Sequence, residues 1–116
     1  MTLIEEIKST LNLEIRSNSR GTEYLEAVLT KKDLESLMSL LTKHLGAAVK
    51  EPGKKVNLPW EIQTVADWLG GVRLEQSFFY KKEGKQVFYA ALWPWESNPD
   101  KITLKTGVRE GVTGST

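Results

Sequence analysis

The sequence predicts a single α+β domain in which two helices cover an antiparallel sheet. Residues 72–95 contain seven of the ten aromatic side chains, in two runs rich in aromatic and β-branched residues on either side of Glu83-Gly84. Such a pattern is typical of a β-hairpin with a two-residue turn. Two other segments, residues 30–45 and 59–69, repeat their apolar residues at helical spacing. The expected order of elements is therefore α-β-β-α-α-β-β-β, and the last three strands form an aromatic-rich meander.

The first helix is expected over residues 2–11. Thr2 is suited to cap its N-terminus, and Glu5 three residues later completes a capping box, in which each side chain bonds the backbone N–H of the other residue. The apolar residues of this segment share one face of the helix: Leu3, Ile4, Ile7 and Leu11. We therefore expect a short amphipathic helix that packs by this face.

A β-hairpin is expected after this helix. Residues 12–16 alternate apolar and polar side chains, which is the period of a strand and not of a helix. Residues 17–21 are rich in Ser, Asn and Gly and predict a turn. Residues 22–29 alternate again and supply the second strand. The alternative is one long helix over residues 22–45, which would leave a sheet of three strands.

Two central helices follow. The first, over residues 30–45, ends at Gly46, a residue type favoured at helix C-termini. Its apolar stripe consists of Leu34, Leu37, Met38, Leu41 and Leu45. The second helix, over residues 59–69, has Asn57 as a candidate N-cap and ends at Gly70-Gly71. We expect both helices to pack on the same face of the sheet.

The register of the aromatic hairpin decides which side chains lie on that face. A turn at Glu83-Gly84 forms four pairs: Tyr80 with Val87, Phe78 with Tyr89, Gln76 with Ala91, and Leu74 with Trp93. The core predicted on this side consists of Phe78, Tyr89, Trp93, Leu37, Leu41 and Leu69. The opposite face then carries Phe79, Phe88 and Leu92, which only the short first helix or another chain remains to cover.

The last strand is expected over residues 101–108, where apolar and polar side chains alternate. We place it at an edge of the sheet, because Lys101 and Lys105 on its polar face would discourage pairing with another chain. Residues 109–116 contain only one sizeable apolar side chain and predict a flexible tail. The domain is therefore assigned to residues 1–108.

Composition excludes several classes of protein. The chain contains no cysteine, which rules out disulfides, thiolate nucleophiles and cysteine-based metal sites. Its N-terminal segment has Glu5 and Glu6 where a secretory signal would be positively charged, and no apolar run approaches the length of a membrane span. We therefore expect a cytoplasmic protein without a membrane partner. The formal net charge of +1 argues against a dedicated nucleic-acid-binding protein.

No motif in the sequence carries a recognisable chemistry. The single histidine, His44, lies near the end of a predicted helix, where a positive charge suits the helix dipole. One histidine without any cysteine does not suffice for a zinc site. A small enzyme or effector-binding domain would have to use His44 or a buried carboxylate such as Asp67, and nothing in the sequence supports this. We expect no cofactor, no metal and no catalytic residue.

The expected function is that of a small non-enzymatic binding or assembly module. One candidate surface is the sheet face that carries Phe79, Phe88 and Leu92, and the other is the corner formed by Trp93 and Trp95. A two-fold contact between two copies would bury the first surface symmetrically. We therefore expect a homodimer, or a contact with another protein.

The alternative function is weak binding of single-stranded nucleic acid. Lys81, Lys82 and Lys85 lie beside Phe79 and Phe88 in the sequence of the hairpin. Aromatic rings on a sheet can stack with bases, and neighbouring lysines can contact phosphates. The lysines are dispersed and the net charge is small, so we rank this function second.

Overall fold

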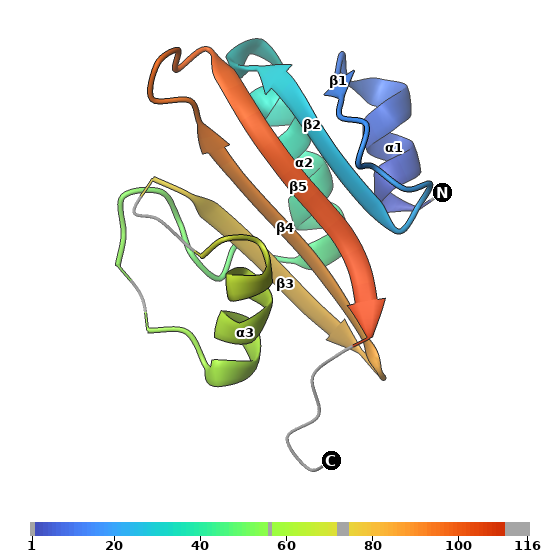
Figure 1. The fold of residues 1–116 in the computed structure, drawn as a ribbon, viewed down its shortest axis with the longest axis vertical. Coiled ribbons are helices and arrows are strands. Elements are labelled where there is room, and N and C mark those ends of the chain that lie inside the picture. The colour runs from blue at the N-terminus through green and yellow to red at the C-terminus, as the bar shows by residue number, and fades with distance from the viewer. Residues whose placement is uncertain (1, 56, 72–74, 111–116) are drawn as a thin grey trace.

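The computed structural model describes residues 2–55, 57–71 and 75–110 of the 116-residue chain. Over these residues it confirms the predicted α+β class, with three α-helices and a five-stranded antiparallel sheet in the predicted order (Figure 1). The helices are α1 (Leu3–Thr10), α2 (Leu34–Leu45), which follows a single 3-10 turn η1 (Lys31–Asp33), and α3 (Trp60–Trp68). The strands are β1 (Glu14–Ile15), β2 (Tyr24–Thr30), β3 (Ser77–Glu83), β4 (Gln86–Pro94) and β5 (Lys101–Glu110).

The helix ends follow most of the sequence signals, although the helix predicted from residue 30 begins as the 3-10 turn η1, and Thr30 makes no side-chain cap bond. The capping box of α1 is confirmed, because Glu5 N donates to Thr2 Oγ1 at 3.2 Å and Thr2 N donates to Glu5 Oε1 at 3.0 Å. Gly46 ends α2 with a φ of +82°, a conformation that glycine adopts without steric cost. Asn57 does not cap α3. Pro59 takes the position before the first helical residue, and it makes no side-chain cap bond.

The first hairpin is confirmed by the pairing of β2. This strand pairs with β1 on one side and with β5 on the other. Its alternating apolar residues Leu25, Ala27 and Leu29 are all buried. The alternative of one helix over residues 22–45 is therefore wrong, because these residues satisfy their backbone hydrogen bonds within the sheet.

β5 is the central strand of the sheet. The strand order is β1-β2-β5-β4-β3, so the prediction of an edge position for β5 was wrong. Local alternation indicates that one face of a strand is buried, but it does not indicate how many strands flank it. The strand also continues to Glu110, which pairs with Gln86. Two residues assigned to the tail, Arg109 and Glu110, therefore lie in the sheet, and residues 111–116 lie outside the described part of the chain.

The register of the aromatic hairpin differs from the prediction by two residues. Phe78 pairs with Ala91 instead of Tyr89, and Tyr80 pairs with Tyr89 instead of Val87. A shift of one residue would have exchanged the two faces of the strand, whereas a shift of two leaves every side chain on its predicted face. The division of the aromatic residues between the faces is therefore confirmed, although the individual pairs are not.

The turn of this hairpin explains the shift. Glu83 pairs with Gln86, so Gly84 and Lys85 form the two-residue loop in place of Glu83-Gly84. Gly84 has a φ of +59°, while no described non-glycine residue has a positive φ. Glycine at the first of the two loop positions is the requirement of a type II′ turn. The predicted pair of Leu74 with Trp93 cannot be compared, because Leu74 lies outside the described residues.

The sheet is the middle layer of a three-layer structure. Figure 1 shows α3 in front of the sheet and α2 behind it. Behind the sheet, α1 and α2 bury a core that includes Ile7, Leu37, Leu41, Leu25, Phe79, Leu92 and Leu104. In front, α3 contributes Val65 and Ala66 to a smaller core with Phe78, Val87, Tyr89 and Ala91. The two central helices therefore cover opposite faces, and the prediction that they share one face was wrong.

The apolar rows of the other strands explain this arrangement. The buried residues of β2 and β5, such as Leu29 and Leu104, lie on the same face as Phe79 and Leu92. That face is apolar across four strands, and it takes the strongly amphipathic α2 together with α1. The face of Phe78 is apolar mainly on β3 and β4, which the short α3 can cover. Phe78, Tyr89, Trp93 and Leu69 do share one cluster as predicted, but Leu37 and Leu41 belong to the other.

The surface that motivated the homodimer is covered within one chain. Phe79 is 1 % exposed and Leu92 is 3 % exposed beneath α1 and α2, and Phe88 is half-buried at the margin of the same core. The expectation that these three residues form an exposed patch was therefore wrong. The short first helix covers that side jointly with α2, so no second copy is needed to remove these rings from water.

We predict that Phe79→Ala destabilises the isolated chain strongly. Removing a buried ring loses its transfer free energy and leaves a cavity, which costs about 3–5 kcal/mol. Urea unfolding followed by circular dichroism measures the change in the free energy of unfolding. The exposed neighbour Lys82 provides a control, and Lys82→Ala should change stability by less than about 0.5 kcal/mol. A loss below about 1 kcal/mol for Phe79→Ala would contradict the placement of α2 over this face.

Candidate functional site

A row of cations and indoles runs along the α3 side of β5. Residues two apart on a strand point to the same face, so Lys101, Lys105 and Arg109 form one row with about 13 Å between neighbours. Each cation lies over one tryptophan ring: Lys101 Nζ is 5.2 Å from the Trp95 centroid, Lys105 Nζ is 5.6 Å from that of Trp93, and the Arg109 guanidinium carbon is 3.6 Å from that of Trp68. These distances are within the range of cation–π attraction.

Trp95 is held in place by two hydrogen bonds at the end of β4. Its backbone N donates to Lys101 O at 2.8 Å, and its indole Nε1 donates to Thr103 Oγ1 at 2.8 Å. Pro94, the last residue of β4, has no backbone N–H, so the regular ladder ends there. The half-buried ring of Trp95 is thereby fixed against β5 while part of it remains accessible.

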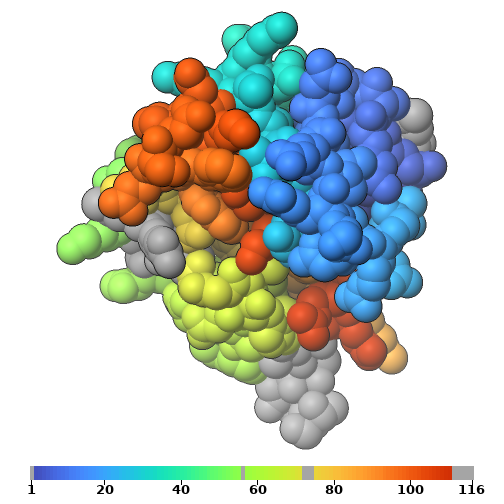
Figure 2. All heavy atoms as spheres, turned by 45° about the horizontal axis from the view of Figure 1, so that its top comes forward, coloured from blue at the N-terminus to red at the C-terminus, as the bar shows by residue number. Residues whose placement is uncertain are grey.

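An open groove lies beside this corner. Its volume is about 1020 Å³, and its lining includes Trp93, Pro94, Trp95, Pro99, Glu75 and Glu96. A smaller and mostly apolar pocket of about 380 Å³ shares Trp93, Pro94, Pro99 and Glu75 with it and continues to Leu34 and Met38. The two hollows therefore meet at the end of β4. Figure 2 shows the orange loop after β4, whose residues Trp95, Glu96, Ser97 and Pro99 border the groove.

The residues proposed from sequence as one binding surface do not lie together. Trp93 and Trp95 line the groove, but Lys81, Lys82 and Lys85 lie at the other end of the β3–β4 hairpin. Lys81 is also engaged there, because its Nζ lies 2.9 Å from Glu83 Oε1 and 3.4 Å from His44 O. Together with the buried Phe79 and Leu92, this separation removes the stacking surface expected for nucleic acid.

The row of cations on β5 was not proposed from the sequence. Its signal was present, because Lys101, Lys105 and Arg109 are spaced by four and therefore share a strand face. The missing information was the strand order, which places β5 next to β4 and so brings these cations to the tryptophans of other elements.

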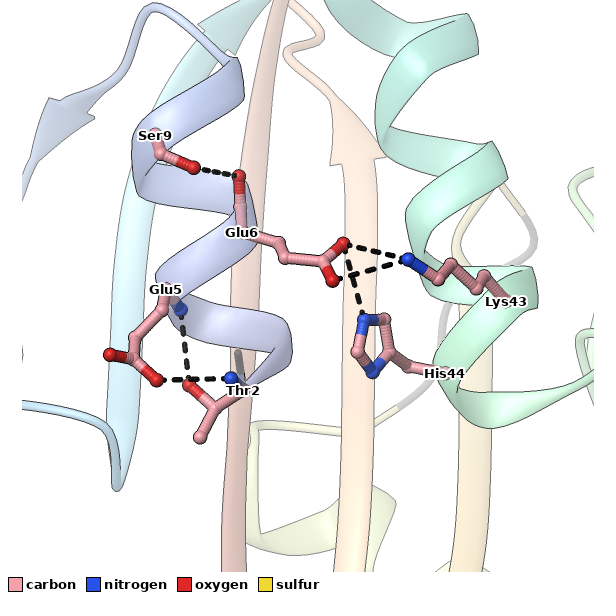
Figure 3. Close-up of polar contacts among 6 residues, drawn as sticks. All are labelled: Thr2, Glu5, Glu6, Ser9, Lys43 and His44. Carbon is pink, nitrogen blue, oxygen red and sulfur yellow. Dashed lines mark hydrogen bonds and ion pairs between the residues drawn. The ribbon is translucent and has the colours of Figure 1, made fainter.

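His44 lies in the contact between α1 and α2. Figure 3 shows that Glu6 of α1 faces both Lys43 and His44 of α2. Lys43 Nζ is 3.2 Å from Glu6 Oε1, and His44 Nε2 is 3.4 Å from Glu6 Oε2. The polar contacts from Lys43 and His44 lower the pKa of the Glu6 carboxyl below its usual value of 4.5. This cluster therefore joins the two helices that cover the larger core.

The two residues considered for catalysis do not converge. His44 is on α2 and Asp67 is on α3, so the sheet separates them. Asp67 is exposed and accepts a hydrogen bond from Gln63 Nε2 at 2.9 Å on its own helix. His44 and Asp67 therefore do not form an acid–base pair within reach of one substrate.

Metal-binding clusters and membrane-spanning helices are absent from the described residues. No group of three or more His, Asp or Glu side chains in them is placed to hold a metal ion. None of the helices in this part of the chain has the length and apolar character needed to cross a membrane.

Comparisons with known proteins point to no relative: no family model, no curated protein and no solved structure matches this chain. The chemistry of its surfaces is therefore the basis for assigning a function.

We predict that Glu6→Gln lowers the melting temperature modestly at pH 7, because it removes the charge that joins α1 to α2. The folded-state pKa of Glu6 is depressed, so its contribution is present above pH 4.5 and is lost as the pH falls through the folded-state value. The deficit of the variant should therefore shrink in acid. Thermal unfolding of both proteins at neutral and at acidic pH measures this difference in melting temperature.

Glu35→Gln serves as the matched control for this prediction. Glu35 is exposed on α2 and makes no ion pair with any described residue. Its neutralisation should lower the melting temperature at pH 7 by less than Glu6→Gln does, because it removes only the interaction of a first-turn carboxylate with the helix dipole. A Glu6→Gln deficit that is equally large in acid, or that Glu35→Gln reproduces, would show that the cluster does not join the helices.

Proposed function

We propose that the protein is a non-enzymatic binding module that takes an extended, proline-rich peptide segment with basic residues into the groove at the end of β4. The observation that carries this proposal is the pair of half-buried indoles, Trp93 and Trp95, on either side of Pro94 in a groove of about 1020 Å³. A cysteine-free chain suits a reducing compartment, so we place this activity in the cytoplasm.

The shape of the groove favours a peptide over a small molecule. Typical small-molecule pockets have about 300–1,000 Å³ and enclose most of their ligand. This groove is open and joins a second hollow of about 380 Å³ around the end of β4. An extended peptide can run from the groove into the second hollow and place successive side chains in both. Polyproline II segments bind aromatic-lined grooves in this extended conformation.

The aromatic lining favours proline in that peptide. Indole rings offer large, flat apolar surfaces against which a pyrrolidine ring can pack, and a polyproline segment loses little conformational entropy on binding. Trp95 is already fixed by its bond to Thr103, so ordering this ring adds little cost to binding.

The charges at the margin of the groove favour basic residues in the ligand. Glu75 and Glu96 line the groove, and neither forms an ion pair within 4.0 Å with any described residue. Lys101 and Lys105 lie over the indole rings, whereas Lys50 is close enough to Glu75 to interact with it electrostatically. An arginine or lysine of a bound peptide would therefore meet two carboxylates, of which Glu96 has no ion-pair partner within 4.0 Å among the described residues.

The cation–indole row on β5 favours a second function, the binding of single-stranded nucleic acid across the front of the sheet. Lys101, Lys105 and Arg109 are suited to contact phosphates, and the neighbouring indoles are suited to stack with bases. Glu26, Glu75 and Glu96 border the same face and would repel a phosphate chain. We therefore rank this function below peptide binding.

We predict that a labelled polyproline peptide carrying two arginines binds with micromolar affinity in a fluorescence-anisotropy titration. Trp95→Ala should weaken this binding by about tenfold or more, because the ring is a central aromatic contact. Trp60→Ala is the matched control, since Trp60 is 56 % exposed and lies outside the groove. Thermal unfolding of both variants verifies that they remain folded.

Two further probes complete the test. The same peptide with glutamates in place of the arginines should bind more weakly, and a single-stranded oligonucleotide should bind only at low salt. No saturable binding of either peptide, or equal losses in Trp95→Ala and Trp60→Ala, would contradict peptide binding. Tight binding of the oligonucleotide that Trp95→Ala abolishes would promote the second function in its place.

A further inference from the structure

A second cleft lies far from the groove, near the opposite end of β5. Its volume is about 690 Å³, and it opens between the start of β2, the end of β5 and the turn between β3 and β4. The side chains that line it include Arg20, Tyr24, Lys85, Tyr89 and Arg109. Two carboxylates, Glu23 and Glu110, also face it. No part of the peptide groove contributes to this cleft, so a ligand bound here is independent of peptide binding.

Gly107 determines the shape of the cleft floor. It is the central residue between two tyrosines, since it pairs with Tyr24 of β2 and with Tyr89 of β4. A Cβ atom at this position would lie 2.6 Å from Glu23 O and 2.7 Å from the Tyr89 hydroxyl. Real Cβ atoms do not approach other atoms so closely, so only glycine allows the Tyr89 ring to lie across β5. The Tyr89 hydroxyl is thereby brought to the cleft.

The Tyr89 hydroxyl has no hydrogen-bond partner among the described residues. The side chain is 5 % exposed, and its ring belongs to the core beneath α3. The hydroxyl is not among the buried unsatisfied atoms and Tyr89 lines the open cleft, so water can satisfy it until a ligand takes its place. The neighbouring Tyr24 differs, because its hydroxyl already donates to Glu26 Oε1 at 2.8 Å. Tyr89 is therefore the tyrosine whose donor remains available to a ligand in the cleft.

Three cations around the cleft are also available. Arg20, Lys85 and Arg109 form no ion pair within 4.0 Å with any carboxylate in the described part of the chain. Arg109 places the face of its guanidinium on Trp68, which orients the group and leaves its N–H edges for other contacts. Burial raises the pKa of Tyr89, while Arg109 and Arg20 act in the opposite direction, so both arginines lie within electrostatic range of the hydroxyl.

The donor set indicates the class of ligand. The cleft offers the hydrogen-bond donors of two guanidinium groups, one ammonium group and one hydroxyl. These are more donors than the two oxygens of a carboxylate can accept, whereas a phosphate presents several acceptor oxygens. Glu23 and Glu110 leave a net charge of about +1 on the lining, which suits a single anionic group better than a polyanion. The volume exceeds that of phosphate alone, and the tyrosine rings offer a wall for an organic substituent.

We propose that this cleft binds the phosphate group of a small phosphate monoester, with Arg20, Arg109 and Lys85 as charge partners and the Tyr89 hydroxyl as a neutral donor. The ester substituent lies against Tyr24 and Tyr89. Gly107 is required because any side chain would displace the Tyr89 hydroxyl from this position.

Titration of the ¹⁵N-labelled protein with phenyl phosphate, with chemical shifts recorded for each amide, tests the proposal. We expect saturable shifts at Gly107, Val108 and Tyr89, and tighter binding of phenyl phosphate than of inorganic phosphate or benzoate. Tyr89→Phe keeps the buried ring and removes only the hydroxyl. It should weaken binding of phenyl phosphate by about tenfold, and so should Arg20→Gln.

Arg16→Gln is the matched control, because Arg16 is an exposed arginine outside the cleft that already faces Glu14 at 3.7 Å. Its affinity for phenyl phosphate should equal that of the unmodified chain. Absence of saturable shifts at millimolar phenyl phosphate would overturn the proposal. So would equal affinities of Tyr89→Phe, Arg20→Gln and Arg16→Gln. Tighter binding of inorganic phosphate than of phenyl phosphate would overturn the role of the tyrosine wall.

Discussion

The structure depends on the need to cover two apolar faces of one sheet. On β3, adjacent residues Phe78 and Phe79 point in opposite directions, and both are buried. Burying one such ring contributes roughly 1.5–3 kcal/mol, so exposing either of them would forgo a substantial part of the stability of a small domain. A helix is therefore required on each side. α2 with α1 covers the face that is apolar on four strands, and α3 covers the other.

The same constraint creates the candidate binding surfaces. α3 is short and covers mainly β3 and β4, which leaves the front of β5 and β2 open. Polar and charged residues occupy this open part of the face, and they include Lys101, Thr103, Lys105 and Glu26. The tryptophans at its margins pack their rings against these cations and keep one side in water. The groove and the cleft lie at the two ends of this uncovered strip.

Signals that act over a few residues were sufficient to predict the elements of this fold. The capping box at Thr2, the glycine after α2 and the alternation in residues 22–29 each place an element correctly. The pairing partners of β5 could not be obtained in this way, because its pairing with β2 joins segments far apart in the sequence. The side of the sheet on which each helix packs depends on that pairing, since the apolar rows of β2 and β5 decide which face is larger.

The candidate sites were predictable to different degrees. The Trp93–Trp95 corner could be proposed from the sequence because its composition is unusual over three residues. The cleft proposed for a phosphate monoester could not be proposed from the sequence, because it combines residues from β2, β4, β5, the β3–β4 turn and the loop before β2. Its only local signal is Gly107, a glycine inside a strand, which is typical of a close approach by another group. Its function as a cradle for Tyr89 requires knowledge of the strand order.

The most direct test of the three-layer arrangement is a pair of double-mutant cycles on the free energy of unfolding. Phe79 and Leu41 share the core beneath α2, whereas Phe78 lies in the core beneath α3. The alanine substitutions at Phe79 and Leu41 should therefore be coupled, by about 0.5–3 kcal/mol, and those at Phe78 and Leu41 should be additive within about 0.5 kcal/mol. Coupling of Leu41 to Phe78 and not to Phe79 would contradict the account, because α2 would then cover the other face of the sheet.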